Sequence, residues 1–481
     1  MSTSLRGFSL TATRRDEERQ WSTPLAKQLA QAIEMTGPIP LASYMRMCLT
    51  GDVGGYYTGA IEQGRDQFGQ KGDFVTSPEI SQVFGELIGI WFVAEWMSQG
   101  RPKSGVELIE VGPGRGTLMD DILRTISNFK DLANAIDAIY MVEASPELRK
   151  TQKKLLCGED RQMAESQSGY HSTCKYNDLP VVWTETRPDS EKMPFIIAHE
   201  FFDALPIHAF QIVNVPPGPT PSSPSPSPTK PPSSDSSKTG LQWREMVVSP
   251  TPPGSTHQSL GTPTSLSHDT PVPDFQLTLS PSSTRHSVYL PESSPRYRAL
   301  KKVPDALIEI CPDASLYATD FATRIGGSAQ HPKAKPSGAA LILDYGPGDG
   351  TVPINSLRGI SRHRMVSPFA EPGLTDLSAD VDFAAIAEAA LRASEGVEVH
   401  GPVEQGVFLE SMGIRERAEV LVRGLKLRGA GDEKASGVER AAKRLVDRGP
   451  EGMGRLYKAL AILPENDGKR RPVGFGGDVG A

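Results

Sequence analysis

The chain has 481 residues and a formal net charge of −7, with 38% hydrophobic residues, 41 prolines and 46 glycines. This length can supply more than one domain, and the proline and glycine content predicts folded parts interrupted by unfolded sequence. An acidic balance without a long basic stripe argues against nucleic acid as the main partner. No apolar stretch approaches the ~18–20 residues of a membrane-spanning helix.

The N-terminal segment, residues 1–24, contains a pattern typical of targeting signals. Residues 1–15 carry three arginines among serines and threonines and no acidic residue. This pattern faintly resembles a mitochondrial transit peptide, and acidic residues end it from Asp16 onward.

The four cysteines are scattered along the chain and form no Cys-x-x-Cys pair. They therefore predict neither a zinc site nor a disulfide framework, which agrees with a reducing compartment. We expect all four to be ordinary packing residues. They are Cys48, Cys157, Cys174 and Cys311.

A helical part is predicted over residues 25–100, with its clearest element in the apolar run at 82–97. A cofactor-binding α/β core follows over residues 101–214, where strand patterns alternate with helical ones. Strand, helix and strand joined by short connections predict a parallel sheet. The predicted strands are 106–111, 138–144, 194–200 and, further along the chain, 339–346.

A glycine-rich turn separates the first core strand from its helix and reads Glu110-x-Gly112-x-Gly114-x-Gly116. No lysine follows, which excludes a phosphate-binding P-loop, and Thr117 occupies the third glycine position of a dinucleotide fingerprint. The spacing resembles the loop of class I S-adenosylmethionine-dependent methyltransferases, where glycines let the backbone approach the cofactor. Glu143 stands where that family holds the ribose hydroxyls with a carboxylate. A purely structural turn is the alternative.

A second turn, from Asp344 to Gly350, has the same spacing. Pro353 and a lack of helical periodicity after it predict that no helix supports this turn. We therefore expect the cofactor at the first loop, and the second to be a strand end near the site.

Residues 215–273 are predicted to be a Pro/Ser-rich, low-complexity insertion around a short strand. Residues 215–239 contain nine prolines and eight serines, so they have almost nothing apolar to bury and are expected to be disordered. The segments 241–248 and 275–279 predict a β-hairpin with enlarged connections, which cost little in loop closure. A proline-rich ligand for a partner domain is the alternative.

The remainder of the α/β core is assigned to residues 274–465. Helical patterns at 382–396 and 435–449 add helices to this part, and residues 466–481 form a C-terminal tail. The fold class predicted from the whole pattern is α/β.

Longer motifs carry a more specific resemblance over about residues 25–465, outside the Pro/Ser-rich insertions. In chain order they are GDFVTSPEISQVFGELIG (72–89), EVGPGRGTLMDDILR (110–124), VEASPELRKTQ (142–152), AHEFFDALPIHAFQ (198–211), WREMVV (243–248), LRGISRHRMVSPFAEPG (357–373), VDFAAIA (381–387) and GMGRLYKALAI (452–462). Together they closely resemble the mitochondrial complex I assembly-factor family of protein arginine methyltransferases and its bacterial relatives. Two positions depart from that family's pattern: His199 replaces an Asn of many members, and Asp380 replaces a His.

The resemblance implies a Rossmann-like, seven-stranded methyltransferase sheet with added helical segments, and S-adenosylmethionine as cofactor. It further implies dimethylation of an arginine on a core matrix-arm subunit of respiratory complex I, during assembly of that complex. The mitochondrial matrix is then the expected compartment and the protein substrate the main partner. A homodimer is left open.

Arginine methylation requires acids near the methyl donor, because a guanidinium stays protonated and is a poor nucleophile. A neighbouring carboxylate can hold it by paired hydrogen bonds and accept its proton. The resemblance favours Glu200 and Asp203, directly after a strand, although acids that complement a helix dipole are the alternative. Glu79 is a third candidate, or a helix-start acid. His208 is expected to be a core or surface histidine, and no metal site is predicted.

Two other functions stay open on the sequence alone. One is an assembly scaffold that binds S-adenosylmethionine without catalysis, and the other is methylation of a different acceptor, since the glycine loop names none. The intact glycines of the first loop, together with Glu143 and the two acids after the strand, argue against a decayed site.

Overall fold

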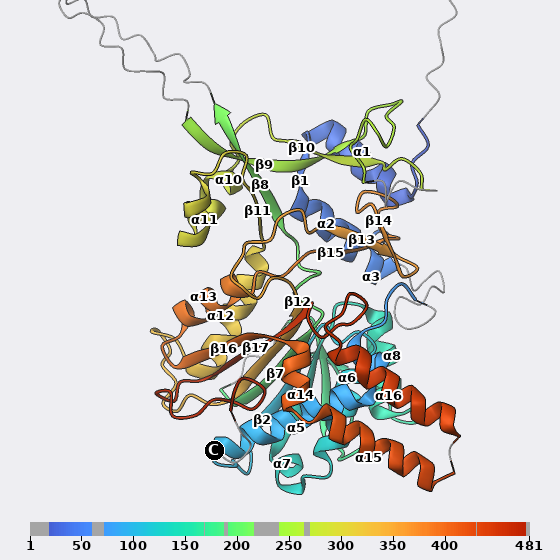
Figure 1. The fold of residues 1–481 in the computed structure, drawn as a ribbon, viewed down its shortest axis with the longest axis vertical. Helices are drawn as coiled ribbons and strands as arrows, with labels where there is room; N and C mark the ends of the chain where they lie inside the picture. The colour runs from blue at the N-terminus through green and yellow to red at the C-terminus, as the bar shows by residue number, and fades with distance from the viewer. Residues whose placement is uncertain are drawn as a thin grey trace, which may run out of the picture.

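The computed structural model describes residues 19–59, 72–167, 169–186, 191–215, 240–263, 270–429 and 431–477. A nine-stranded sheet with helices on both faces forms the larger body, and a smaller five-stranded sheet lies at one end of it (Figure 1). The transit-like residues 1–15 and the Pro/Ser-rich residues 216–239 lie outside the described residues.

The large sheet has the order β16-β17-β12-β7-β2-β3-β6-β5-β4. Its five central strands run parallel. They are β2 (Val106–Val111), β3 (Ile136–Val142), β6 (Pro180–Thr184), β7 (Met193–His199) and β12 (Ala339–Tyr345). The direction of chain progression reverses between β2 and β7, and open α/β sheets bind ligands at the carboxyl ends of strands beside such a reversal.

Two antiparallel pairings complete the sheet on the β12 side. The strand β17 (Tyr457–Pro464) lies between β12 and β16 (Val397–Glu404), antiparallel to both. Numbered along the chain, the seven main strands then have the order 3-2-1-4-5-7-6. The short strands β4 (Ala164–Ser166) and β5 (Gly169–Thr173) extend the opposite edge. The predicted Rossmann-like α/β fold is confirmed, and so are the four predicted strands.

Apolar side chains from both faces of the large sheet form two layers of core, as parallel strands covered on both sides require. One face packs against α5 (Gln82–Ser98), α6 (Thr117–Ile126) and the C-terminal helices. The other face packs against α12 (Pro312–Gly326) and α13 (Phe383–Ala393). The remaining helices of this body are α4 (Ser77–Ile80), α7 (Lys130–Ala135), α8 (Pro146–Cys157), α14 (Gln405–Ser411), α15 (Ile414–Leu427) and α16 (Asp432–Val446). All four cysteines are free and three are buried, as expected for packing residues.

The small sheet contains the predicted hairpin, because β10 (Phe275–Leu279) pairs antiparallel with β9 (Gly240–Pro250). The strands β1 (Ile39–Pro40), β8 (His208–Val215) and β11 (Leu307–Ile310) complete this sheet. It packs against α1 (Pro24–Thr36) and α2 (Leu41–Thr50). Three short helices lie nearby, namely α3 (Tyr56–Gly59), α10 (Arg285–Tyr289) and α11 (Pro295–Leu300) (Figure 1). A three-stranded sheet also lies nearby and consists of β13 (Arg358–Ser361), β14 (Arg364–Val366) and β15 (Asp376–Ser378).

Residues 251–263 differ from the expectation of low-complexity disorder. They form turns in which main-chain groups bond one another, and the N–H of Thr251 donates to the carbonyl of Asp274 at 2.8 Å. Arg19 also donates to the carbonyl of Thr251. Polar sequence can order in this way when its backbone groups find partners, even with little apolar area to bury.

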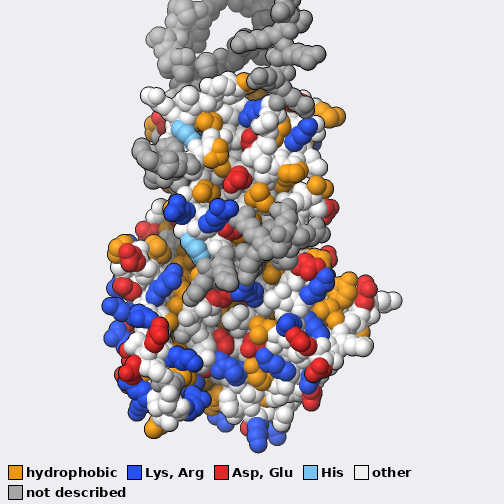
Figure 2. Space-filling view, turned by 90° about the vertical axis from the view of Figure 1, so that its right-hand side faces the viewer, with side chains coloured by type: hydrophobic (Ala, Val, Ile, Leu, Met, Phe, Trp, Pro, Cys, Tyr) orange, Lys and Arg blue, Asp and Glu red, His pale blue; other side chains and the backbone are white. Residues whose placement is uncertain are grey.

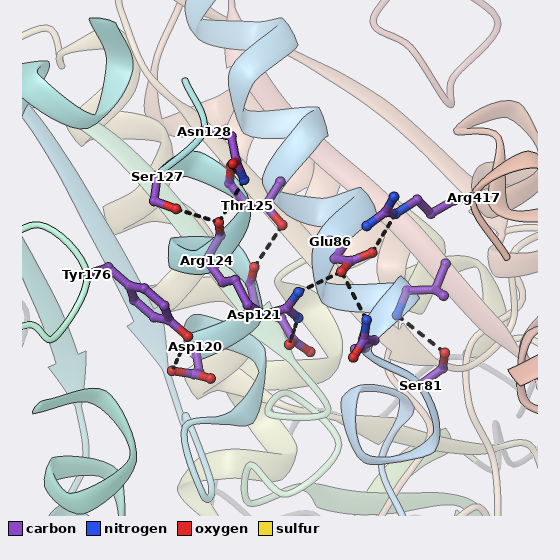
Figure 3. A network of polar contacts seen from close by, with 12 residues as sticks. Ser81, Glu86, Asp120, Asp121, Arg124, Thr125, Ser127, Asn128, Tyr176 and Arg417 are labelled. Atoms are coloured by element: carbon purple, nitrogen blue, oxygen red, sulfur yellow. Dashed lines mark hydrogen bonds and ion pairs between the residues drawn. The ribbon is translucent and has the colours of Figure 1, made fainter. Parts of the chain in front are cut away.

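A buried carboxylate joins three helices that are distant in the sequence (Figure 3). Glu86, on α5, accepts hydrogen bonds from Arg124 on α6 and from Arg417 on α15, both at 2.7 Å. Burial raises the pKa of Glu86, but the hydrogen bonds from Arg417 and Arg124 outweigh burial and lower the pKa below its ordinary value. The charged form therefore ties the helix pair α15–α16 to the core.

The surface of the larger body carries charges of both signs. Lysines and arginines are interspersed with acidic side chains on the face shown in Figure 2. Within the described residues, none of the helices combines the length and apolar character needed to cross a membrane.

Deleting residues 217–238 should leave the melting temperature and cofactor affinity almost unchanged. Val215 already pairs with Gly240 at the end of the β8–β9 ladder, so the two ends are held together without the segment. Sequence with so few apolar residues adds little packing. Thermal unfolding and calorimetry on the shortened protein, with the ends joined by a Gly-Ser linker, test this. A fall of many degrees would contradict it.

Candidate active site

A cavity of about 330 Å³ lies at the carboxyl ends of β2, β3 and β7. The glycine loop, the segment after β3 and the segment after β7 form part of its wall. Side chains from α2, α3, the 74–79 segment and α12 complete it. The cavity is therefore at the reversal of strand order, where ligands of such sheets bind. It brings together six of the eight predicted site residues, namely Glu79, Glu110, Gly112, Gly114, Glu143 and Glu200.

The glycine loop has a backbone that side chains would not tolerate. Gly112, Gly114 and Gly116 have φ values of 66°, 52° and 84°, in the left-handed region that favours glycine. A Cβ on Gly112 would lie 2.4 Å from Cδ2 of Phe201, a cavity-lining ring. Gly116 does not line the cavity, but forms the turn into α6.

The carboxyl group of Glu143 is fixed in the cavity wall directly after β3. Its Oε1 accepts from the N–H of Ser145 at 2.8 Å, and its Oε2 accepts from Nε2 of Gln152 at 3.1 Å. The same Gln152 amide donates to the carbonyl of Gly114, so it links the acid to the glycine loop. A carboxylate has about four acceptor positions, so two stay available for a pair of hydroxyl groups.

Glu110 supplies a second buried carboxyl group. It is 3% exposed, and its Oε2 is buried without a hydrogen-bond partner in the described structure. Burial, followed by the neighbouring charge of Glu143, raises the pKa of Glu110 well above its ordinary value. An orphaned buried oxygen in a cavity wall is commonly satisfied by a ligand. Together with the glycine loop and Glu143, it gives a wall that fits S-adenosylmethionine.

Glu200 follows β7 in a strained backbone conformation. Its φ is +47°, which costs a residue with a Cβ about 1–2 kcal/mol. Its N–H donates to the carbonyl of Leu343, and its side chain, which lines the cavity, lies 3.4 Å from the N–H of Ser77. Residues held in such conformations by their surroundings cluster at functional sites.

Asp344, from the second glycine turn, holds the turn that carries Glu200. Its Oδ2 accepts from the N–H groups of Phe201, Phe202 and Asp203 at 3.1, 2.9 and 3.3 Å. This confirms that the second turn is a strand end near the site without a following helix. No helix begins within residues 201–206 either, so the helix-dipole interpretation of Glu200 and Asp203 was wrong.

Asp203 lies behind the cavity and does not line it. Its Oδ2 accepts from the hydroxyl of Tyr345 at 2.6 Å, and its Oδ1 is buried without a hydrogen-bond partner in the part of the chain described here. Burial raises the pKa of Asp203 despite the Tyr345 hydrogen bond. Burial and the charge of Asp203, in turn, raise the pKa of Glu200 well above its usual range. The two acids therefore act on each other electrostatically.

Glu79 is a helix-start acid, as one of its two interpretations predicts, because it lies in the first turn of α4, which Ser77 begins. It also lines the cavity, where it pairs with Arg115 at 3.3 Å. The two positions that depart from the family pattern behave differently. Burial lowers the pKa of His199 to about 3, so this cavity-lining ring is neutral, whereas Asp380 pairs with Arg358 at 2.8 Å.

Several side chains of the site were not predicted from the sequence. The guanidinium of Arg358 lies 4.3 Å from the ring centroid of Tyr345, and the hydroxyl of Tyr57 donates to Asp376 at 3.0 Å. Tyr57 also lines the cavity. These residues come from segments far apart along the chain, and no local spacing indicated them.

Gly114→Val should weaken S-adenosylmethionine binding at least about tenfold, or about 1.4 kcal/mol. A branched residue is strained at a φ of 52° and occupies space that the ligand requires. Calorimetry on the folded variant measures the affinity. Gly348→Ala is the control in the second turn, because the nearest atom to its Cβ would be Cε of the flexible Lys458 side chain, at 2.9 Å. A larger loss in the control would favour the second turn.

Cofactor affinity should rise with pH through about 7. Burial raises the pKa of Glu143 to about 7, although hydrogen bonds from Ser145 and Gln152 oppose the rise. Below that pH the carboxyl is protonated in the free protein and is a weaker acceptor for ribose hydroxyls, so affinity should fall by up to about tenfold per pH unit. S-Adenosylhomocysteine titrations between pH 6 and 8 test this. The slope should flatten in Glu143→Gln, and an unchanged slope would contradict the assignment.

Comparison with known proteins agrees with this geometry. The family model described as "Putative S-adenosyl-L-methionine-dependent methyltransferase" matches residues 87–403. Similar proteins named "Protein arginine methyltransferase NDUFAF7, mitochondrial" include one from Xenopus laevis, 33% identical over 95% of this chain and 89% of its own length. The human protein of that name is 32% identical over 92% of this chain and 84% of its own length.

Solved structures share the fold. A protein from Burkholderia thailandensis, crystallised with S-adenosyl-homocysteine, superposes with a TM-score of 0.63 at 21% identity and covers 94% of this chain and 93% of its own. The matched family model, the relatives and the strand order of the large sheet agree with one another. The chain therefore belongs to this family of S-adenosylmethionine-dependent methyltransferases, and S-adenosylmethionine is its cofactor.

Proposed function

We propose that this methyltransferase modifies an arginine side chain of a protein. The observation that carries the proposal is Glu200, whose carboxyl group is only 10% exposed in the cavity wall and whose backbone is held in a strained conformation. Among the described residues it forms no ion pair with a lysine or arginine, and its close neighbour His199 is neutral. The names of the relatives support the same acceptor.

The charges of the wall suit a cationic acceptor. The two arginines that line the cavity are each paired with an acid, Arg115 with Glu79 and Arg46 with Asp313. Within the described residues, the carboxyl groups of Glu200, Glu110 and Glu143 form no ion pair with a lysine or arginine. The wall is therefore negatively charged where these groups ionise. A guanidinium that enters beside Glu200 would favour its charged form, since an opposite charge within about 4–6 Å lowers a carboxyl pKa.

Each proposed site residue then has a role. S-adenosylmethionine supplies an electrophilic methyl group when bound, and Gly112, Gly114, Glu110 and Glu143 would hold it, while Gly116 shapes the turn that carries the glycine loop into α6. Glu200 holds the guanidinium by hydrogen bonds and accepts the proton that the alkylated nitrogen releases. Asp203 keeps the pKa of Glu200 high by like-charge repulsion, which makes Glu200 a stronger base. Glu79 also lines the cavity, paired with Arg115, and is the alternative acid for the substrate.

We further propose that the substrate is a core matrix-arm subunit of respiratory complex I, dimethylated in the mitochondrial matrix during assembly. The motif resemblance, the transit-like residues 1–15 and the mitochondrial relatives support this. Mass spectrometry of complex I subunits from cells with and without the protein tests it. An arginine whose methylation disappears without the protein is the expected result, and identical methylation in both would contradict the proposal.

Glu200→Gln should bind S-adenosylmethionine nearly normally and lose methyl transfer by about 10²-fold or more, the scale typical of general-base loss. Asp203→Asn should also lose transfer. Because it removes the like charge beside Glu200, it should in addition shift the acid limb of the pH–rate profile to lower pH. Single-turnover methylation of the purified subunit measures both effects.

The control for simple loss of charge is Glu159→Gln, at a side chain that is 71% exposed and does not line the cavity. Near-wild-type transfer in Glu200→Gln and Asp203→Asn would remove both acids from the catalytic site and point to Glu79. Complex I assembly that is normal with Glu200→Gln would instead favour the non-catalytic scaffold.

A further inference from the structure

Two histidines and a glutamate meet in the small sheet, away from the proposed catalytic acids. His208 begins β8, Glu245 lies on the neighbouring strand β9, and His286 lies on α10. One potential ligand atom from each of the three lies within 4.8 Å of the other two. From the sequence, His208 was expected to be an ordinary core or surface histidine, and no metal site was predicted.

The geometry directs both imidazoles at one carboxylate oxygen. Nδ1 of His208 lies 2.8 Å from Oε1 of Glu245, and Nδ1 of His286 lies 3.3 Å from the same oxygen. The two rings are adjacent, with centroids 4.2 Å apart. Ligand atoms of a tetrahedral zinc site are separated by about 3.3 Å, given bond lengths of about 2.0–2.1 Å. The two nitrogen–oxygen separations lie within about 0.5 Å of that value, and the two nitrogen atoms are no more than 4.8 Å apart.

Neighbouring residues orient the carboxylate for this role. The hydroxyl of Thr284 donates to Oε2 of Glu245, which leaves Oε1 for the histidines. The N–H of Ser280 donates to the backbone carbonyl of Glu245, so the strand position is fixed as well. Such supporting hydrogen bonds are typical of metal ligands.

Burial of the Glu245 carboxyl group favours a cation beside it. The side chain is fully buried, and its ion-pair partners within the described residues are His208 and His286. A buried carboxylate is costly unless a cation is paired with it. A divalent ion bound by the neutral imidazoles would supply that countercharge.

We propose that His208, Glu245 and His286 bind one divalent transition-metal ion of the zinc class, with water in the fourth position. Two imidazoles and one carboxylate form a ligand set that such ions favour. The ion would tie α10 to β8 and β9. It would also fix the start of β8, two residues after Pro206, which lines the methyltransferase cavity. Its role is structural, and it takes no part in methyl transfer.

Cobalt(II) is the probe, because tetrahedral coordination gives it visible absorption bands. The full-length protein is treated with a chelator, dialysed and titrated with Co²⁺, and Zn²⁺ is then added as competitor. The wild type should bind one equivalent of Co²⁺, lose the bands on addition of Zn²⁺, and gain melting temperature with Zn²⁺.

His286→Ala is the main variant, because its side chain is 46% exposed and its loss should not prevent folding. It should weaken Co²⁺ binding by more than the roughly 10–100-fold that loss of an outer partner costs. His331→Ala, at an exposed histidine outside the cluster, should bind as the wild type does. If the wild type binds no Co²⁺, the three residues form a hydrogen-bonded triad without a metal. Binding unaffected by His286→Ala would place the metal elsewhere, and either result overturns the proposal.

Discussion

The turn that presents Glu200 depends on one buried carboxylate. Asp344 accepts hydrogen bonds from three successive N–H groups after β7, and also from the N–H of Tyr345. Each of these donors would otherwise be buried and unsatisfied, at a cost of about 1–3 kcal/mol apiece. Because Asp344 is the penultimate residue of β12 and Glu200 follows the adjacent parallel strand β7, the pairing of two strands determines the geometry of the site.

The same carboxylate adds to the like-charge repulsion among the acids of the site. Burial raises the pKa of Asp344 well above its ordinary value, and the neighbouring charges of Asp203 and Glu200 raise it further, while hydrogen bonds from backbone N–H groups oppose the rise. Three acids this close do not all ionise together, so they share fewer charges than they have carboxyl groups. A cation that enters the cavity relieves this repulsion. Selectivity for a guanidinium would then come from the cluster as a whole rather than from a single acid.

Much of the fold and the cofactor wall could be predicted from the sequence because the signals are local. Buried parallel strands are continuous apolar runs, and the loop from Glu110 to Gly116 requires glycine at positive φ whatever lies elsewhere. The Tyr345–Asp203 contact and the His208–Glu245–His286 cluster could not be predicted, since they join segments brought together only by tertiary packing. The turns of 251–263 were missed because composition does not reveal where backbone groups find partners.

The position of β17 has a consequence for how the protein is made. This strand comes last among the named strands, yet it lies inside the sheet between β12 and β16 (Figure 1). Until residues 457–464 emerge from the ribosome, β12 has an open edge and β16 lacks its neighbour β17, so the domain cannot close during synthesis. A premature stop codon shortly before Tyr457 should therefore be as damaging as one near the start of the gene, because the truncated chain would expose its central strands to aggregation and degradation.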